Sequence, residues 1–303
     1  MSSEDLTGSV IAGYHLLERV GEGGTAVVYR AQHPDRGACA LKILRPKMRA
    51  DRTAVQRFLR EAAYGARVQH SGVVRTFEYG EAADGLQFLA LEWAEGELLA
   101  KFIRRTGAVS FAVAAGVVRQ IADALAAAHA AGIIHRDLKP ENIIYDPRDQ
   151  RARLLDFGHA RDADLGPEER LTRTGFFVGT LQYVAPEALS GALVGEAADI
   201  YSLATIGFLL LTGHLPYSAK SPRELFHQLL TEPPQTLSEA RHDLVFPRAL
   251  EEVVARGLNR EPAKRQPTVV AFAEEFTAAT TQPASGGRSG LLGSLKGMFG
   301  AGR

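Results

Sequence analysis

The sequence predicts an α+β fold in two lobes: a small lobe with a five-stranded β-sheet and one helix, and a larger, mainly helical lobe. Up to residue 93, short β-like runs alternate with glycine-containing turns, whereas beyond residue 94 apolar residues recur at helical spacing. A chain of 303 residues with 46% hydrophobic residues can bury the core that two lobes need. We therefore predict a domain at 14–280, with lobes at 14–93 and 94–280, between a leader at 1–13 and a flexible tail at 281–303.

The small lobe is predicted from β-like runs at residues 14–20, 26–31, 39–42, 73–79 and 86–92. Residues 53–68 carry an apolar stripe at helical spacing, which Thr53 and Gln56 could open as a capping box. Between the first two strands, residues 21–25 form a hairpin tip that is almost bare backbone, so N–H groups there can reach a phosphate. As a lone motif, an ordinary glycine-rich hairpin is an equally good interpretation.

The large lobe is predicted from runs with helical periodicity and from helix boundary signals. A long helix at 111–131 ends at Gly132, and Ser221 followed by Pro222 opens another helix that runs to about Thr231. Further helices are expected at 199–211, 248–258 and 269–279, and a short hairpin at 143–145 and 153–155.

Composition excludes several classes of protein. Lysine plus arginine total 35 and aspartate plus glutamate total 35, so no bulk attraction to nucleic acid is expected. The single cysteine, Cys39, lies in an apolar run, and we expect a buried, unreactive thiol in a reducing compartment. The N-terminus lacks the basic start and apolar core of a signal peptide. No transmembrane segment is expected, and residues 200–211 are the nearest candidate.

Residues 135–142, His-Arg-Asp-Leu-Lys-Pro-Glu-Asn, place a carboxylate, an ammonium and an amide within one short loop, a set that can handle a phosphate, a metal and a hydroxyl together. The segment resembles the catalytic loop of the protein kinase superfamily, H-R-D-L-x-x-x-N. The Lys-Pro-Glu filling is similar to serine/threonine kinases, and the chain as a whole resembles the bacterial eukaryotic-like serine/threonine protein kinases. We refer to residues 135–142 as the catalytic loop.

The resemblance implies a bilobal protein-kinase-like fold and transfer of the γ-phosphate of ATP to Ser/Thr hydroxyls of proteins, with Mg²⁺ or alternatively Mn²⁺ as the metal. It assigns Asp137 to the hydroxyl proton, Lys139 to the moving phosphoryl oxygens, and Asn142 with Asp156 to the metal. Asp156 opens Asp-Phe-Gly, which matches D-F-G; alone, this tripeptide is usually a turn.

The resemblance also implies a nucleotide site in the small lobe. Gly21, Gly23 and Val28 match the pattern G-x-G-x-x-G-x-V, but Ala26 replaces the third glycine, and we expect a stiffer loop there. Lys42 would reach the α- and β-phosphates while paired with Glu61; a solvated surface ion pair is the alternative. The residues expected to contact nucleotide are Val20, Gly21, Glu22, Gly23, Gly24, Val28, Ala40 and Lys42, with backbone groups of Glu92 and Ala94 in a hinge segment at 92–96.

Regulation and substrate binding are assigned to residues between the Asp-Phe-Gly and Ala-Pro-Glu motifs. Thr172 and Thr174 are expected phosphosites, for which a solvated loop is the alternative, and Thr180 is expected at the peptide platform. By resemblance, the Glu187 carboxylate pairs with Arg265, and Asp199 caps backbone groups of the catalytic loop.

Two other function classes remain in view. A pseudokinase that acts as a binding module would be expected to lack Lys42, Asp137 or Asp156; all are present, and only Ala26 counts toward it. A small-molecule phosphotransferase of related fold would generally lack the Ala-Pro-Glu segment. The implied partners are protein substrates, ATP and a kinase homodimer for autophosphorylation in trans, in the cytoplasm. The apolar residues of the 281–303 tail could mark a partner or membrane contact, but glycines there favour disorder.

Overall fold

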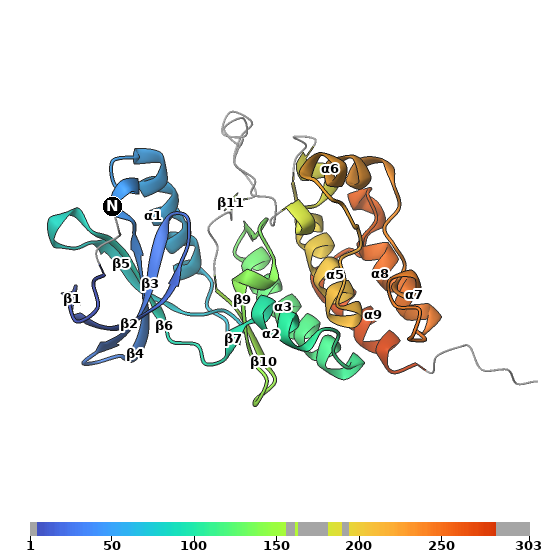
Figure 1. Ribbon diagram of the computed structural model, residues 1–303, viewed down its shortest axis with the longest axis horizontal. Helices are drawn as coiled ribbons and strands as arrows, with labels where there is room; N and C mark the ends of the chain where they lie inside the picture. Colours follow the sequence, from blue (N-terminus) through green and yellow to red (C-terminus); the bar gives the residue numbers. More distant parts are fainter. Residues whose placement is uncertain (1–4, 156–160, 163–180, 190–193, 283–303) are drawn as a thin grey trace, which may run out of the picture.

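The computed structural model describes residues 5–155, 161–162, 181–189 and 194–282. Its two lobes lie side by side along the long axis, with the sheet and one helix in one lobe and most helices in the other (Figure 1). The predicted α+β, bilobal architecture is therefore confirmed. The boundary that we place at residues 93 and 94 remains a prediction.

The small-lobe sheet has six antiparallel strands in the order β1-β2-β3-β4-β6-β5, which corrects the predicted five. The strands are β1 (Val10–Ile11), β2 (Tyr14–Glu22), β3 (Ala26–His33), β4 (Gly37–Leu44), β5 (Thr76–Glu81) and β6 (Gln87–Glu92). The additional strand, β1, has only two residues, too few for an alternating pattern, and it folds back on β2 through Ala12 and Gly13, both at positive φ. Strand β5 begins later than predicted because Val74 donates its N–H to Leu154 of the other lobe.

Helix α1 (Arg52–Arg67) lies against this sheet. Its N-cap is Asp51, whose side chain accepts the N–H groups of Thr53 and Ala54, so the predicted capping box at Thr53 is wrong. The predicted apolar stripe is confirmed, because Phe58 and Ala62 are buried against the sheet.

The large lobe is built around two apolar helices. Its helices are α2 (Leu99–Thr106), α3 (Phe111–Ala130), α4 (Pro186–Leu189), α5 (Ala197–Thr212), α6 (Pro222–Thr231), α7 (Leu237–Ala240), α8 (Arg248–Gly257) and α9 (Val269–Thr280). Helix α5 is buried over almost its whole length, and α3 packs against both α5 and α9. The predicted helices are present within two residues, whereas α2, α4 and α7 were not predicted.

Short strands and turns complete this lobe. Strands β10 (Arg151–Leu154), β9 (Ile143–Asp146) and β7 (Glu97–Leu98) form one sheet in that order, which confirms the predicted hairpin, and β8 (Ile133–Ile134) pairs with β11 (Arg161–Asp162). Single turns of 3-10 helix lie at Pro46–Met48, Ala83–Gly85, Pro140–Asn142, Leu181–Tyr183 and Pro262–Lys264.

Among the described residues, α3 is the one helix long and apolar enough to cross a membrane by length and composition, with a mean hydropathy of 1.5. Half of that stretch is buried inside the lobe, as in the core helix of a globular domain. The expectation that residues 200–211 would be the nearest candidate is therefore wrong. Helix α3 was overlooked because most of its apolar residues are alanines, which raise the mean hydropathy although their side chains are small.

Candidate functional site

Helix α5 holds the catalytic loop in place through Asp199. The fully buried Asp199 accepts N–H groups from His135 and Arg136, both at 2.9 Å, and lies 2.7 Å from Nε2 of His129. Arg136 has φ +64°, a left-handed conformation, and its guanidinium donates to the Val194 carbonyl. Asp199 thus caps backbone N–H groups of the catalytic loop, as predicted.

The pKa of Asp199 is lowered although burial opposes its ionisation, because the hydrogen bond and charge of His129, with further contributions from His135 and Arg136, outweigh the burial. An ionised carboxylate is therefore the form that holds the two loop amides.

Two side chains of the catalytic loop, Lys139 and Asn142, contact the carboxylate of a third, Asp137. Lys139 Nζ lies 2.8 Å from Asp137 Oδ2, and Asn142 Nδ2 donates to the Asp137 carbonyl at 2.8 Å and to Oδ2 at 3.2 Å. Asp137 itself is 9% exposed. The residues that the sequence singled out are thus brought together, with the carboxylate oriented by both neighbours.

Lys42 and Glu61 form an ion pair between β4 and α1. Their side chains are 17% and 13% exposed, so the alternative of a solvated surface pair is not what the structure contains. Lys42 pairs across the sheet with Val28, and Ala40 with Leu91, on the strand face opposite the fully buried Cys39 and Leu41. This half-exposed face thus carries three residues predicted at the nucleotide.

The glycine-rich tip connects β2 to β3. A methyl group built on Gly23 or Gly24 would meet no atom closer than 3.7 Å, so internal packing does not require glycine there. Their use is consistent with close approach of a ligand to the backbone. Ala26 differs: it is 3% exposed and packs in one cluster with Leu44, Phe58, Ala62 and Leu89. The methyl that departs from the family pattern therefore fills a contact with helix α1.

The hinge segment begins at Glu92, whose backbone N–H donates to the Arg75 carbonyl at 2.9 Å. Because this N–H is already used, the carbonyl is the backbone group of Glu92 that could make the predicted contact with adenine. The Glu92 side chain is also engaged: both its oxygens accept from the Arg153 guanidinium, at 2.8 and 2.5 Å. The hydrogen bond from Arg153 lowers the pKa of Glu92. Next to it, Trp93 lies under the Arg30 guanidinium, 5.0 Å from the ring centroid.

Sequence reasoning missed the contact between Glu92 and Arg153. The sequence does hold one signal: Arg153 lies between the apolar residues Ala152 and Leu154 in a predicted strand. In the structure Arg153 is 7% exposed, and a charged residue buried to this extent needs a partner.

Several predicted residues lie outside the described residues: Asp156 with its Asp-Phe-Gly motif, Thr172, Thr174 and Thr180. Within the described ranges, no group of three or more His, Cys, Asp or Glu side chains could hold a metal ion. Asn142 suits a hard cation, because its amide nitrogen is used on Asp137 and its Oδ1 remains as the acceptor.

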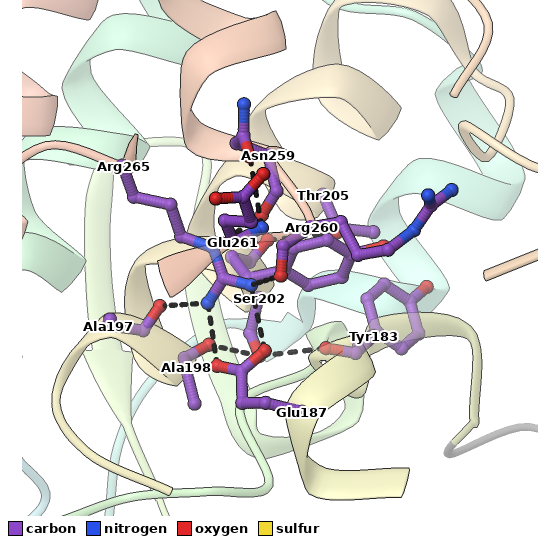
Figure 2. A network of polar contacts seen from close by, with 11 residues as sticks. Tyr183, Glu187, Ala197, Ala198, Ser202, Thr205, Asn259, Arg260, Glu261 and Arg265 are labelled. Carbon is purple, nitrogen blue, oxygen red and sulfur yellow. Dashed lines mark hydrogen bonds and ion pairs between the residues drawn. The ribbon is translucent and has the colours of Figure 1, made fainter. Parts of the chain in front are cut away.

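The segment at 181–189 is fixed by a buried network (Figure 2). Arg265, whose side chain is fully buried, donates to both oxygens of Glu187 at 2.7 and 2.8 Å and to the Ala197 carbonyl at 2.8 Å. Ser202 of α5 donates to the Tyr183 carbonyl at 2.8 Å. The predicted pair of Glu187 with Arg265 is therefore present, and it joins the Ala-Pro-Glu segment to the core of the large lobe.

Comparisons with known proteins agree with this architecture. The family described as Protein kinase domain matches residues 14–277. The serine/threonine-protein kinase pkn3 of Myxococcus xanthus is 35% identical over 284 residues, which are 91% of this chain and 52% of that protein. PknH of Mycobacterium tuberculosis is 38% identical over 265 residues, 87% of this chain and 41% of that protein. The chain thus spans about half, or less, of the length of these curated relatives.

The fold itself matches a solved structure. The crystal structure of the Mycobacterium tuberculosis PknI kinase domain superposes with a TM-score of 0.69 at 31% sequence identity, covering 90% of this chain and 98% of that one. Both lobes and the catalytic loop fall within the matched family region. The chain therefore belongs to the protein kinase family and is similar to its bacterial serine/threonine members.

Proposed function

We propose that this chain is the catalytic domain of a serine/threonine protein kinase that transfers the γ-phosphate of ATP to hydroxyl groups of proteins. The observation that carries the proposal is the pair of assembled charge clusters: Lys42 with Glu61 in the small lobe, and Asp137 with Lys139 and Asn142 in the large lobe. Phosphoryl transfer needs positioned groups and neutralised charge more than covalent chemistry, and these clusters supply both.

In this proposal Asp137 accepts the proton of the substrate hydroxyl, and Lys139, 2.8 Å away, faces the transferred phosphoryl oxygens. Glu61 holds the Lys42 ammonium for the α- and β-phosphates. Val28 and Ala40 line the adenine on the half-exposed face of the sheet, and the Glu92 carbonyl with Ala94 meets its edge.

The protein kinase family uses ATP with a divalent metal. Asn142 Oδ1 and Asp156 would hold the metal here, and oxygen ligands suit Mg²⁺, or Mn²⁺ as the alternative. When bound, the metal would neutralise negative charge on the phosphates. The protein's own part is orientation: the Asn142 amide nitrogen is fixed on Asp137, which links the proposed metal ligand to the proposed base.

The segment between the Asp-Phe-Gly and Ala-Pro-Glu motifs is proposed to be phosphorylated at Thr172, Thr174 or both, by a second copy of the chain, with Thr180 at the peptide platform. The network from Glu187 through Arg265 supports a fixed substrate platform. A cytoplasmic location is proposed because ATP is the donor, and the buried Cys39, whose pKa is raised by burial, suits a reducing compartment.

The test compares the starting protein with Asp137→Asn after incubation with ATP and Mg²⁺ and with a serine- or threonine-containing protein. Mass spectrometry should find phosphate on the added protein and within residues 163–180 of the starting chain. In the variant, transfer should fall by roughly 10²-fold or more while ATP binding is retained, because the base acts on the hydroxyl. Equal transfer by both would refute the role of Asp137, and absence of transfer and of ATP binding in the starting protein would refute the proposed function.

A further inference from the structure

Arg153 of β10 makes a fork contact with a residue of the other lobe, 61 positions away along the chain. Its two terminal nitrogens reach both oxygens of Glu92, and the same guanidinium donates to the Val73 carbonyl at 3.1 Å. The Arg153 side chain is 9% exposed and the Glu92 side chain 37% exposed, so the pair is shielded from solvent on the arginine side. Such planar, two-bond contacts are among the stronger charge pairs.

The position of the pair connects three parts of the proposed nucleotide site. Glu92 begins the hinge segment, whose backbone would meet the adenine. Val73 lies in the loop after α1, the helix that carries Glu61. Arg153 is three residues before Asp156, a proposed metal ligand. One guanidinium therefore ties the start of the hinge and the loop beyond α1 to the strand that leads to the metal site.

Backbone hydrogen bonds of the next residue, Leu154, hold the strand that carries Arg153 in place. Val74 donates to the Leu154 carbonyl and Leu154 donates to the Gly72 carbonyl, both at 2.8 Å. With β10 fixed in this way, the Arg153 side chain sets where the Glu92 side chain lies. Arg75 adds to this by donating its N–H toward the Glu92 carboxylate at 3.4 Å.

We propose that Arg153 is a positioning residue for ATP: its contact with the Glu92 carboxylate fixes the backbone of the hinge segment at the place where adenine binds. The inference rests on the proposed kinase function and deepens it. It requires that loss of the contact weakens ATP binding selectively, because the catalytic loop and the pair of Lys42 with Glu61 do not contact Arg153 among the described residues.

The experiment measures ATP affinity in two ways, on the starting protein and on Arg153→Met, Arg153→Lys and Glu92→Gln. Steady-state kinetics with a saturating protein substrate separate KM for ATP from kcat. Fluorescence of Trp93, the single tryptophan of the chain, reports binding of a non-hydrolysable ATP analogue without turnover. Thermal unfolding verifies that each variant is folded, and Arg153→Lys provides the test if Arg153→Met does not fold.

We expect Arg153→Met to raise KM for ATP and the dissociation constant of the analogue by roughly tenfold, with kcat changed by less than about threefold. For Arg153→Lys, both constants should lie between those of the starting protein and of Arg153→Met, since lysine keeps the charge but cannot make the two-bond contact. Adding Arg153→Met to Glu92→Gln should have little further effect on KM, because both changes remove the same contact.

The control is Arg248→Met, which removes an ion pair with Glu252 on the exposed face of α8 and should leave KM unchanged. The inference is overturned if Arg153→Met binds the analogue as tightly as the starting protein, or if stability and kcat fall while KM does not. If the starting protein itself binds no analogue, it is the proposed function that fails.

Discussion

Gly96 ends the hinge segment in a conformation that other residues adopt only under strain. Its φ is +110°, and a Cβ built there would lie 2.5 Å from the Tyr145 carbonyl oxygen. The close approach lets β7 pair with β9, where Glu97 faces Tyr145. Sequence reasoning placed Gly96 in the hinge segment but gave it no task, since its requirement comes from a backbone 49 positions further along the chain.

We predict that Gly96→Ala lowers the free energy of unfolding by about 2 kcal/mol or more, from backbone strain together with the contact to Tyr145. Urea unfolding of the purified domain measures it. The matched control is Gly116→Ala in α3, where a methyl meets nothing within 4 Å and should instead stabilise the helix by up to about 1 kcal/mol. Equal effects of the two substitutions would show that the Gly96 conformation is not needed.

At the scale of elements, the glycine-rich tip and helix α1 share a packing contact through Ala26. Phe58 and Ala62 of the helix lie in the same buried cluster as Ala26, at the first residue of β3. We therefore expect movement of the tip to be coupled to the helix that carries Glu61. The stiffer tip stays a prediction, to which the burial of Ala26 adds a second physical reason beside the loss of glycine flexibility.

Ala26→Gly should lower the free energy of unfolding by about 1–2 kcal/mol, since it removes a buried methyl and adds backbone entropy to the unfolded chain. Differential scanning calorimetry or urea unfolding can record the change. Gly24→Ala at the same tip is exposed, with open space around it, and should change stability by no more than about 0.5 kcal/mol. A neutral Ala26→Gly would contradict the coupling.

Elements with long, strongly periodic patterns could be predicted, and short ones could not. The stripe of α1 was identified, but its start was misplaced because Asp51 caps the helix one position before its first residue. Helix α2 has only eight residues, and three are basic, which obscures its buried face. Helix α7 has four, although Thr236 and Glu239 form a capping box visible in the sequence. Strand β1 has only two residues, too few to show the alternating pattern that identifies a strand, although its partner β2 follows directly in the chain.

The catalytic loop could be anticipated because its residues are adjacent in sequence, and Asp137, Lys139 and Asn142 do converge. Contacts between distant residues depended on resemblance, as for Lys42 with Glu61, or were missed, as for Arg153 with Glu92. Spacing alone cannot reveal a pair that forms only when two lobes fold together.

For the whole molecule, buried Asp199 connects stability to pH. Because its folded pKa is lowered below the ordinary value of 3.8, it stabilises the fold above that pH, and this contribution is lost as pH falls through the folded pKa. We predict that the free energy of unfolding declines below about pH 4. Asp199→Asn should be less stable at pH 6 by about 2 kcal/mol or more and should show a weaker decline in acid. Urea unfolding at pH 3 to 6 tests both.

Asp243→Asn is the control for this pH dependence. The side-chain hydrogen bond from Arg241 lowers the pKa of Asp243 to about 2, but this carboxylate lies at the surface, where water screens the pair. Its replacement should therefore leave stability at pH 6 nearly unchanged. If Asp199→Asn behaves in the same way, the buried carboxylate does not hold the catalytic loop.

The parallel bridge between Val73 and Leu154 is one of the contacts that join the two lobes. Within the described residues, the small lobe is joined to the large one by the chain at the hinge segment, by this bridge with its two backbone hydrogen bonds, and by side-chain contacts such as Arg153 with Glu92 and Arg67 with the Ala131 carbonyl. Because these contacts lie beside the hinge segment, we expect them to allow fewer directions of lobe movement than bending at one flexible linker would. Groups beside these contacts, such as the Glu92 carbonyl, should shift less than the glycine-rich tip, whose residues 22–25 are exposed. If nucleotide binds as proposed, the adenine end of its site would therefore be the more rigid end and the tip over the phosphates the more movable one.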